Sequence, residues 1–270
     1  SLAVCLFLVL FAGDSFAANY DWVGTLSSDW ATPQNWLKGG NTQNASGTYP
    51  GQTITTTDVV RIGVNNNFTL SPVLSTTLAN NIRSIEFGDN GGNDMTFTIN
   101  TTFSLTVTNG ITQDDNGGTG GITTTIMGGG TLNCKTFNVG DGTNPNSGNN
   151  STIINCNINS LVVTNALTLN STSPFFGNGR TNNPVFNLNS GTLSVNNIAT
   201  ADANWKTGNS CTFKMCIGTA ANTLILLGST PFTLDNNVNN IDLVSGGTVS
   251  QSTVIYANTN ASTNQTIYTS

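Results

Sequence analysis

The chain has 270 residues and a formal net charge of −6, and only 7% of its residues are charged, against about 25% in an average soluble domain. It contains no His, which excludes Ser-His-Asp and Cys-His nucleophilic systems and the usual zinc ligand sets. Nucleic acid is not expected as a partner, because phosphate neutralisation needs clustered Lys and Arg and the chain has only seven of them under a negative net charge. The composition therefore points away from an enzyme and gives no direct sign of a reaction.

The first residues are typical of an export signal. Ser1–Ala12 is an apolar run, and the small residues Ser15 and Ala17 follow it at the spacing of a cleavage site. We expect cleavage after Ala17, which predicts a secreted or cell-surface protein. The run is too short to span a bilayer, which needs about 20 apolar residues, so the chain is not expected to cross a membrane. The alternative is that residues 1–17 remain as a hydrophobic arm.

Residues 18–50 are set apart by their tryptophans, because Trp22, Trp30 and Trp36 lie close together there. Two interpretations are open. The rings could cover the exposed edge of the strands that follow, as the terminal repeats of a solenoid do. They could instead form a stacking platform for sugar rings and so bind carbohydrate.

From residue 51 to residue 270, apolar residues recur with a period of two. This alternation predicts strands that are buried on one face. Thr often fills the intervening position, which suits the outer face of a strand, and no apolar stripe of helical length is present. The fold class is predicted to be all-β. The alternating residues include Met95, Phe97 and Ile99; Leu105 and Val107; Phe137 and Val139; Phe186 and Leu188; and Leu193 and Val195.

The arrangement of these strands favours a single-stranded parallel β-helix, or β-solenoid, with the Trp-rich segment as its N-terminal cap. Similar phrases return along the chain, as if one position of a coil were revisited, and charges that would repel in stacked rows are scarce. A coil of about 22 residues would give roughly ten coils and a rod near 50 Å long. An antiparallel β-sandwich is the alternative. The recurring phrases are Gly130–Asn133, Ala166–Asn170, Gly191–Asn196 and Gly247–Ser250.

Two acidic clusters are candidate sites. Asp89 and Asp94 bracket a short Asn- and Gly-rich segment that offers oxygen ligands for Ca²⁺, although the segment lacks the ligand register of a Ca²⁺ loop, a turn between strands is the favoured interpretation, and no cofactor is otherwise expected. Asp114 and Asp115 form the only adjacent acidic pair and could supply an acid and a base to a polysaccharide-degrading β-helix. Adjacent residues of a strand point to opposite faces, which weighs against that role.

The cysteines leave two readings open. If residues 1–17 are removed, the mature chain keeps Cys134, Cys156, Cys211 and Cys216, an even number in an oxidising compartment. They could form disulfides, although Cys211 and Cys216 can pair only if a turn separates them. They could equally be buried thiols that behave as small hydrophobic residues.

The start of the chain resembles a known group of proteins. Tyr20–Gly24, the Asp29-Trp30 and Asn35-Trp36 pairs, and the later Asp58–Ile62 are similar to the opening of large secreted bacterial surface proteins. In these autotransporter-like or sorting-signal-bearing exoproteins, such a module leads into a parallel β-helix. The tail around Ser252–Tyr256 resembles coils that continue into further repeats, so we expect a C-terminus that is truncated.

These features predict a non-catalytic extracellular stalk or adhesin. Its partners would be sister coils stacked end to end, with polysaccharide or a host cell surface as a further partner. The alternative is a carbohydrate-binding or polysaccharide-degrading module on the same fold.

Overall fold

The structure is a computed structural model that describes residues 18–39, 47–52, 57–88, 94–113, 121–140, 150–170, 182–201, 211–215, 220–233, 239–242 and 252–257. Within these ranges the chain is built from β-strands and one short 3-10 turn, η1 (Pro33–Asn35), which confirms the all-β prediction. The strands are β1 (Asn19–Trp22), β2 (Trp36–Lys38), β3 (Val59–Ile62), β4 (Val73–Leu74), β5 (Ile82–Phe87), β6 (Met95–Ile99), β7 (Ser104–Gln113), β8 (Ile122–Val139), β9 (Asn150–Asn170), β10 (Asn182–Leu188), β11 (Gly191–Ala201), β12 (Cys211–Met215), β13 (Asn222–Leu226), β14 (Phe232–Thr233), β15 (Asn239–Asp242) and β16 (Ser252–Tyr256).

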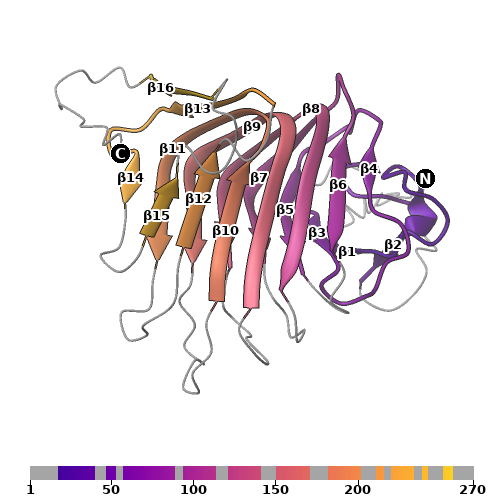
Figure 1. Ribbon diagram of the computed structural model, residues 1–270. Helices are drawn as coiled ribbons and strands as arrows, with labels where there is room; N and C mark the ends of the chain where they lie inside the picture. The colour runs from indigo at the N-terminus through magenta and orange to yellow at the C-terminus, as the bar shows by residue number, and fades with distance from the viewer. Residues whose placement is uncertain are drawn as a thin grey trace, which may run out of the picture.

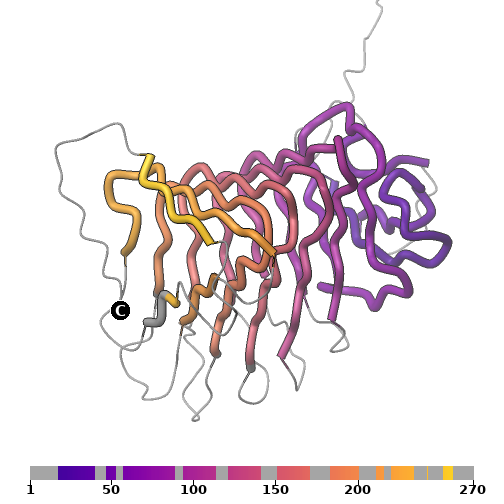
Figure 2. Tube along the Cα trace, turned by 45° about the horizontal axis from the view of Figure 1, so that its top comes forward, coloured from indigo at the N-terminus to yellow at the C-terminus, as the bar shows by residue number. Residues whose placement is uncertain are grey.

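The strands stack in parallel from one coil to the next, as a β-solenoid requires (Figure 1). Among the described strands, only β1 and β2 pair in antiparallel fashion. The tube in Figure 2 follows successive coils wound side by side along one axis. The parallel solenoid is therefore confirmed, and the antiparallel sandwich is excluded.

Each coil contributes to three columns of strands, which we call faces A, B and C. The longest strand, β9, has 21 residues and passes through all three faces, with register irregularities where it turns between them. Face A contains β1, β3, β5, the C-terminal parts of β7, β8, β9 and β11, and β14. Face B contains residues 104–107, 131–134, 160–163 and 191–195, with β13 and β16. Face C contains β4, β6, the N-terminal parts of β8 and β9, and β10, β12 and β15.

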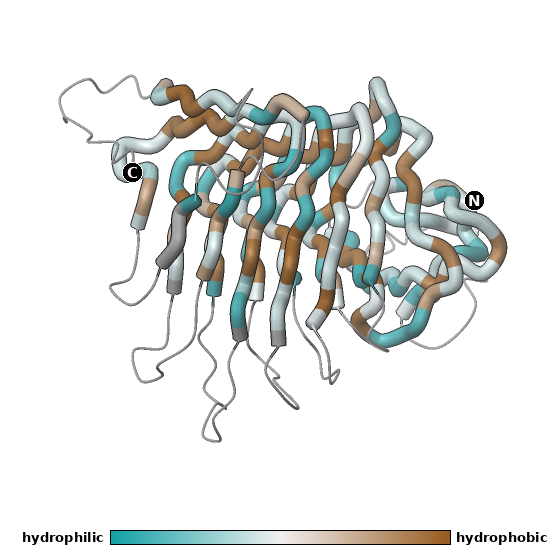
Figure 3. The backbone as a smooth tube through the Cα atoms, in the orientation of Figure 1, coloured by the Kyte–Doolittle hydropathy of each residue, from teal (hydrophilic) through white to brown (hydrophobic). Residues whose placement is uncertain are grey.

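The alternation in the sequence places one apolar column on the inside of each face. On face B this column is almost entirely leucine, and its five leucines are buried. Burying one such side chain stabilises the fold by about 1.5–3 kcal/mol. Hydrophobic positions recur from coil to coil along the backbone (Figure 3), and the inward side chains form one buried cluster. The face B column is Leu105, Leu132, Leu161, Leu193, Leu224 and the partly buried Val254.

The coils are longer than the expected 22 residues, and correspondingly fewer. Neighbouring members of one inward column of face A are 25 to 31 residues apart: Val60, Ile85, Ile111, Phe137, Leu167 and Ile198. The repeat length could not be read from the sequence, because the connections vary in length while the strands remain in register. The prediction of roughly ten coils and a rod of 50 Å is therefore wrong.

Two of the recurring phrases do occupy one position of the coil. Gly130–Asn133 in β8 and Gly191–Asn196 in β11 both lie on face B, separated by a single rung of β9. Ala166–Asn170 lies on face A instead, and Gly247–Ser250 is outside the described residues. The repeated Gly-Thr-Leu segments therefore mark one column of the solenoid, but not every similar segment belongs to that column.

Residues of the expected cap at 18–50 are hydrogen-bonded to strands of the expected repeats at 51–270. Strand β1 pairs in parallel with β3 and is itself the first rung of face A. Residue Asp29 forms an isolated parallel bridge with Val73 of face C. The N-terminal segment is thus built onto the solenoid as its first layer.

Candidate functional site

The three tryptophans of the N-terminal segment form a buried aromatic cluster. Trp36 lies at the centre, with its ring centroid 4.7 Å from that of Trp22 and 4.8 Å from that of Trp30, both in edge-to-face contact. Each indole nitrogen donates to a backbone oxygen: Trp22 to Leu70, Trp30 to Pro50, and Trp36 to Trp30. All three side chains are 0% exposed. No ring face is left for a sugar, so the stacking platform does not fit this structure, whereas a covering layer over the first coils does.

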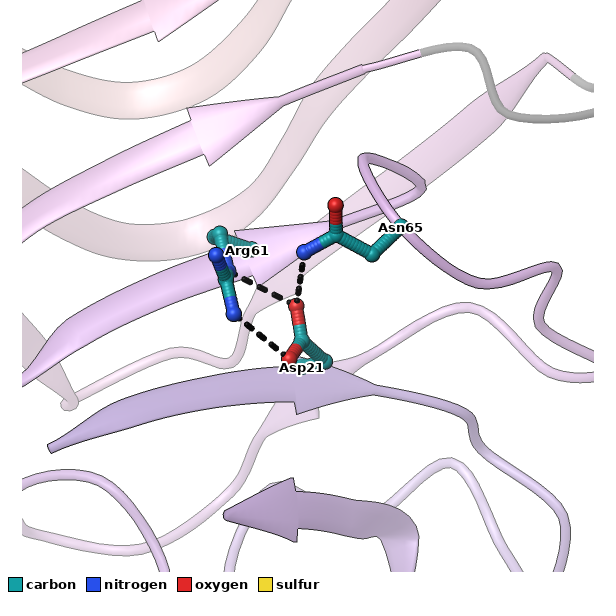
Figure 4. Close-up of polar contacts among 3 residues, drawn as sticks. All are labelled: Asp21, Arg61 and Asn65. Carbon is teal, nitrogen blue, oxygen red and sulfur yellow. Dashed lines mark hydrogen bonds and ion pairs between the residues drawn. The ribbon is translucent and has the colours of Figure 1, made fainter. Parts of the chain in front are cut away.

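One ion pair joins the first two rungs of face A (Figure 4). Arg61 Nη2 donates to Asp21 Oδ2 at 2.7 Å, Arg61 Nε lies 2.7 Å from Asp21 Oδ1, and Asn65 Nδ2 donates to Asp21 Oδ1 at 3.0 Å. Asp21 is 1% exposed. With Arg61 and Asn65 both bound to it, the carboxylate is engaged in structure and is not open to a substrate.

Glu86 extends this row of charges by one rung, because it pairs in register with Arg61. Burial raises the pKa of the Glu86 carboxyl, the Arg61 charge lowers it, and the Asp21 charge raises it. Asp21, Arg61 and Glu86 therefore form a column of alternating sign on the outer side of face A. Sequence reasoning assigned no role to them, because their contact depends on the pairing of strands that are distant in the sequence.

The acidic candidates are only partly described. Asp94 Oδ1 accepts a hydrogen bond from the backbone N–H of Thr123 at 3.0 Å, which holds the neighbouring coil beside it. Asp89 lies outside the described residues, as do Asp114 and Asp115. Within the described ranges, no group of three or more His, Cys, Asp or Glu side chains could hold a metal ion.

Two of the cysteines are buried free thiols, which corrects the disulfide reading for them: Cys134 and Cys156. Cys211 is also buried, with its Sγ 3.4 Å from the backbone oxygen of Leu169, and Cys216 lies outside the described residues. Cys134 faces inward on face B and Cys156 faces inward on face C, so they pack as small apolar residues in different columns. Burial raises the pKa of both thiols to about 12.

The outer side of face B carries a regular row of hydroxyl groups, which we call the hydroxyl column. It is produced by a short motif, Ser or Thr followed by an inward Leu or Val, that returns once per coil. Sequence reasoning found only two of its occurrences, because the spacing between them is irregular. The hydroxyl column is Ser104, Thr131, Ser160, Thr192, Thr223 and Thr253.

Among the described residues, no helix has both the length and the apolar character needed to cross a membrane.

No protein-family model, no curated protein and no solved structure matches the chain.

Proposed function

We propose that the chain is a non-catalytic extracellular scaffold, a rigid β-solenoid that acts as a stalk or adhesive element. The observation that carries the proposal is the unbroken parallel stacking of coils from β3 to β14 on face A and through to β16 on face B. Each coil buries its apolar columns only against its neighbours, which gives length and rigidity together.

The surface chemistry supports the same function. The outward positions of the coils are mostly Thr, Ser and Asn, and the buried charged pair Asp21–Arg61 is used to join rungs. Such side chains form many weak contacts and few reactive ones. An extracellular location rests on the apolar run at Ser1–Ala12, which lies outside the described residues, and on the resemblance to surface exoproteins.

The two ends of the described solenoid differ, which bears on how it would associate. At the N-terminal end, β2 pairs antiparallel to β1 and the tryptophan cluster lies over the first coils. At the other end, among the described strands, β14, β15 and β16 each pair on one side only. A strand with a free edge can accept another strand. We therefore propose that end-to-end association uses the edge formed by β14, β15 and β16, because the N-terminal end is covered.

Sedimentation across a range of protein concentrations tests this association. The wild-type protein should gain mass as the concentration rises. Ile255→Lys, which places a charge on the edge strand β16 at a side chain that is 41% exposed, should remain monomeric. Leu26→Lys is the matched control, because Leu26 is 66% exposed in the N-terminal segment and should associate as the wild type does.

Two results would count against the proposal. A wild-type protein that stays monomeric at every concentration would remove the association, leaving a single rigid stalk. Release of reducing ends from a polysaccharide by the purified chain would overturn the non-catalytic function itself.

A further inference from the structure

The hydroxyl column on face B has the properties of a binding surface. Its six hydroxyl groups lie in register on neighbouring strands, and adjacent strands are held about 4.8 Å apart by the backbone ladder. The spacing is therefore set by the fold and does not depend on side-chain flexibility. Ser and Thr also have short side chains that lose little rotamer freedom when a ligand binds.

Most of these hydroxyl groups are not used within the fold. Asn133 Nδ2 donates to Ser104 Oγ at 3.3 Å and to Thr106 Oγ1 at 3.5 Å. In the described part of the chain, the hydroxyl groups of Thr131, Ser160 and Thr192 make no hydrogen bond, nor do those of Thr223 and Thr253. Each of them can both donate and accept toward the outside.

Face B is also uncharged across its outer side, unlike the other two faces. The second outward row, two residues further along each strand, consists of Thr106, Asn133, Val162, Ser194, Ile225 and Ile255. Charged side chains stand on face A, at Arg61 and Glu86, and on face C, at Lys214 and Asp242. Arg83 and Lys135 occupy the corner where face B turns into face A, at the edge of this surface. A chain with net charge −6 repels polyanions, and a neutral face offers nothing to attract them.

We propose that face B binds a neutral, extended polysaccharide that lies along the solenoid axis, rung by rung. A sugar polymer presents hydroxyl groups at its edges and C–H groups on its ring faces, which match the hydroxyl column and the aliphatic side chains of Val162 and Ile225 beside it. Single hydroxyl contacts are weak, but a periodic ligand makes many at once, so their contributions combine. The inference deepens the proposed adhesive function and rests on it by naming the class of surface that the scaffold contacts.

The test is sedimentation of the protein with insoluble microcrystalline cellulose, with cross-linked polygalacturonate as the anionic comparison. The wild-type protein should bind cellulose and not polygalacturonate. Thr131→Val, Thr192→Val and Thr223→Val each remove one hydroxyl but keep a β-branched side chain. Each should weaken binding about fivefold, and the triple variant about 100-fold.

A matched triple variant controls for changes in the fold. Thr112, Thr125 and Thr168 are outward-facing threonines on faces A and C, and their replacement by Val should leave cellulose binding unchanged. Circular dichroism and the urea midpoint of each variant show whether the solenoid is intact. The single variants provide a graded series if the triple variant does not fold.

The outcomes separate this inference from the proposed function. Suppose that the wild-type protein associates, or is a rigid monomer, but does not sediment with cellulose. This result overturns the polysaccharide site alone. Equal loss in both triple variants, or stronger binding to polygalacturonate, overturns it as well. Hydrolysis of the cellulose would overturn the proposed scaffold function.

Discussion

Arg61 contacts both carboxylate oxygens of Asp21 from the neighbouring strand, although the two residues are separated by 40 positions in the sequence. The pair holds the N-terminal strand β1 to the first full rung of the solenoid. A buried charge that loses its partner is costly, whereas the loss of both charges together costs little.

Asp21→Ala is expected to lower the free energy of unfolding by about 3 kcal/mol, because it leaves Arg61 without its partner. The double variant Asp21→Leu with Arg61→Met should recover most of that loss. Urea unfolding of the two variants and the wild type measures both effects. A double variant as unstable as the single one would show that the residues act separately.

Glu86→Gln is expected to stabilise the fold at pH 7. Burial raises the pKa of Glu86, so the folded state favours the protonated carboxyl. The stability that the protonated carboxyl contributes is lost as the pH rises through the folded pKa. The advantage of Gln should therefore be present at pH 7 and absent near pH 4. Unfolding curves at the two pH values test this. If the advantage were greater at pH 4, the Arg61 charge would outweigh burial.

The thiols of Cys134 and Cys156 predict a loss of stability in alkali. The pKa of an unfolded thiol is near 9, whereas burial raises the pKa of both folded thiols to about 12. Between these pH values the unfolded state can ionise its thiols and the folded state cannot, so the free energy of unfolding falls as the pH rises. Each thiol should lower the free energy of unfolding by about 1.4 kcal/mol per pH unit across this window. The Cys134→Ala, Cys156→Ala double variant should show a flatter profile than the wild type. Equal slopes would mean that the thiols reach solvent in the folded state.

Trp36→Ala is expected to destabilise the fold by about 3–5 kcal/mol, because it removes the central ring of the buried cluster. Trp36→Phe should cost less. Thermal unfolding followed by tryptophan fluorescence measures both. A variant that lost polysaccharide binding at an unchanged melting temperature would restore the stacking-platform interpretation.

Gly191→Ala tests how tightly the coils are stacked at the start of β11. Gly191 has a φ of +76°, and a Cβ there would collide with the carbonyl oxygen of Ile158 in the previous coil. Gly39 has a φ of +73° with no atom near its Cβ position, so Gly39→Ala isolates the conformational cost of about 1 kcal/mol. The Gly191 variant should lose about 2–4 kcal/mol more. Equal losses of stability in the two variants would indicate that the backbone at this corner shifts to accommodate the added Cβ.

The sequence predicted strands well where alternation was strict. Phe97 and Ile99 face inward as their spacing required, and so do Leu193 and Val195. The period of the coil could not be read, because connections of varying length separate strands that are nevertheless in register. A repeat defined by hydrogen bonding between coils leaves only a weak signal along the chain.

The roles of the candidate-site residues were harder still to predict, because they depend on which strands pair between coils. Trp30 is buried in contact with Phe97 of β6, whose ring centroid lies 5.6 Å from its own, and its local sequence does not show this contact. The role of Asp21 required knowing that β1 lies beside β3. The hydroxyl column was visible only after the strands of face B had been aligned.

In three successive coils a face A strand ends at Gln113, Val139 or Asn170, and the next face C strand begins at Ile122, Asn150 or Asn182. The sequence between these ends differs from coil to coil, yet the strands on either side stay in register. The pitch of the solenoid is therefore set by strand pairing and is independent of the chain that joins one rung to the next.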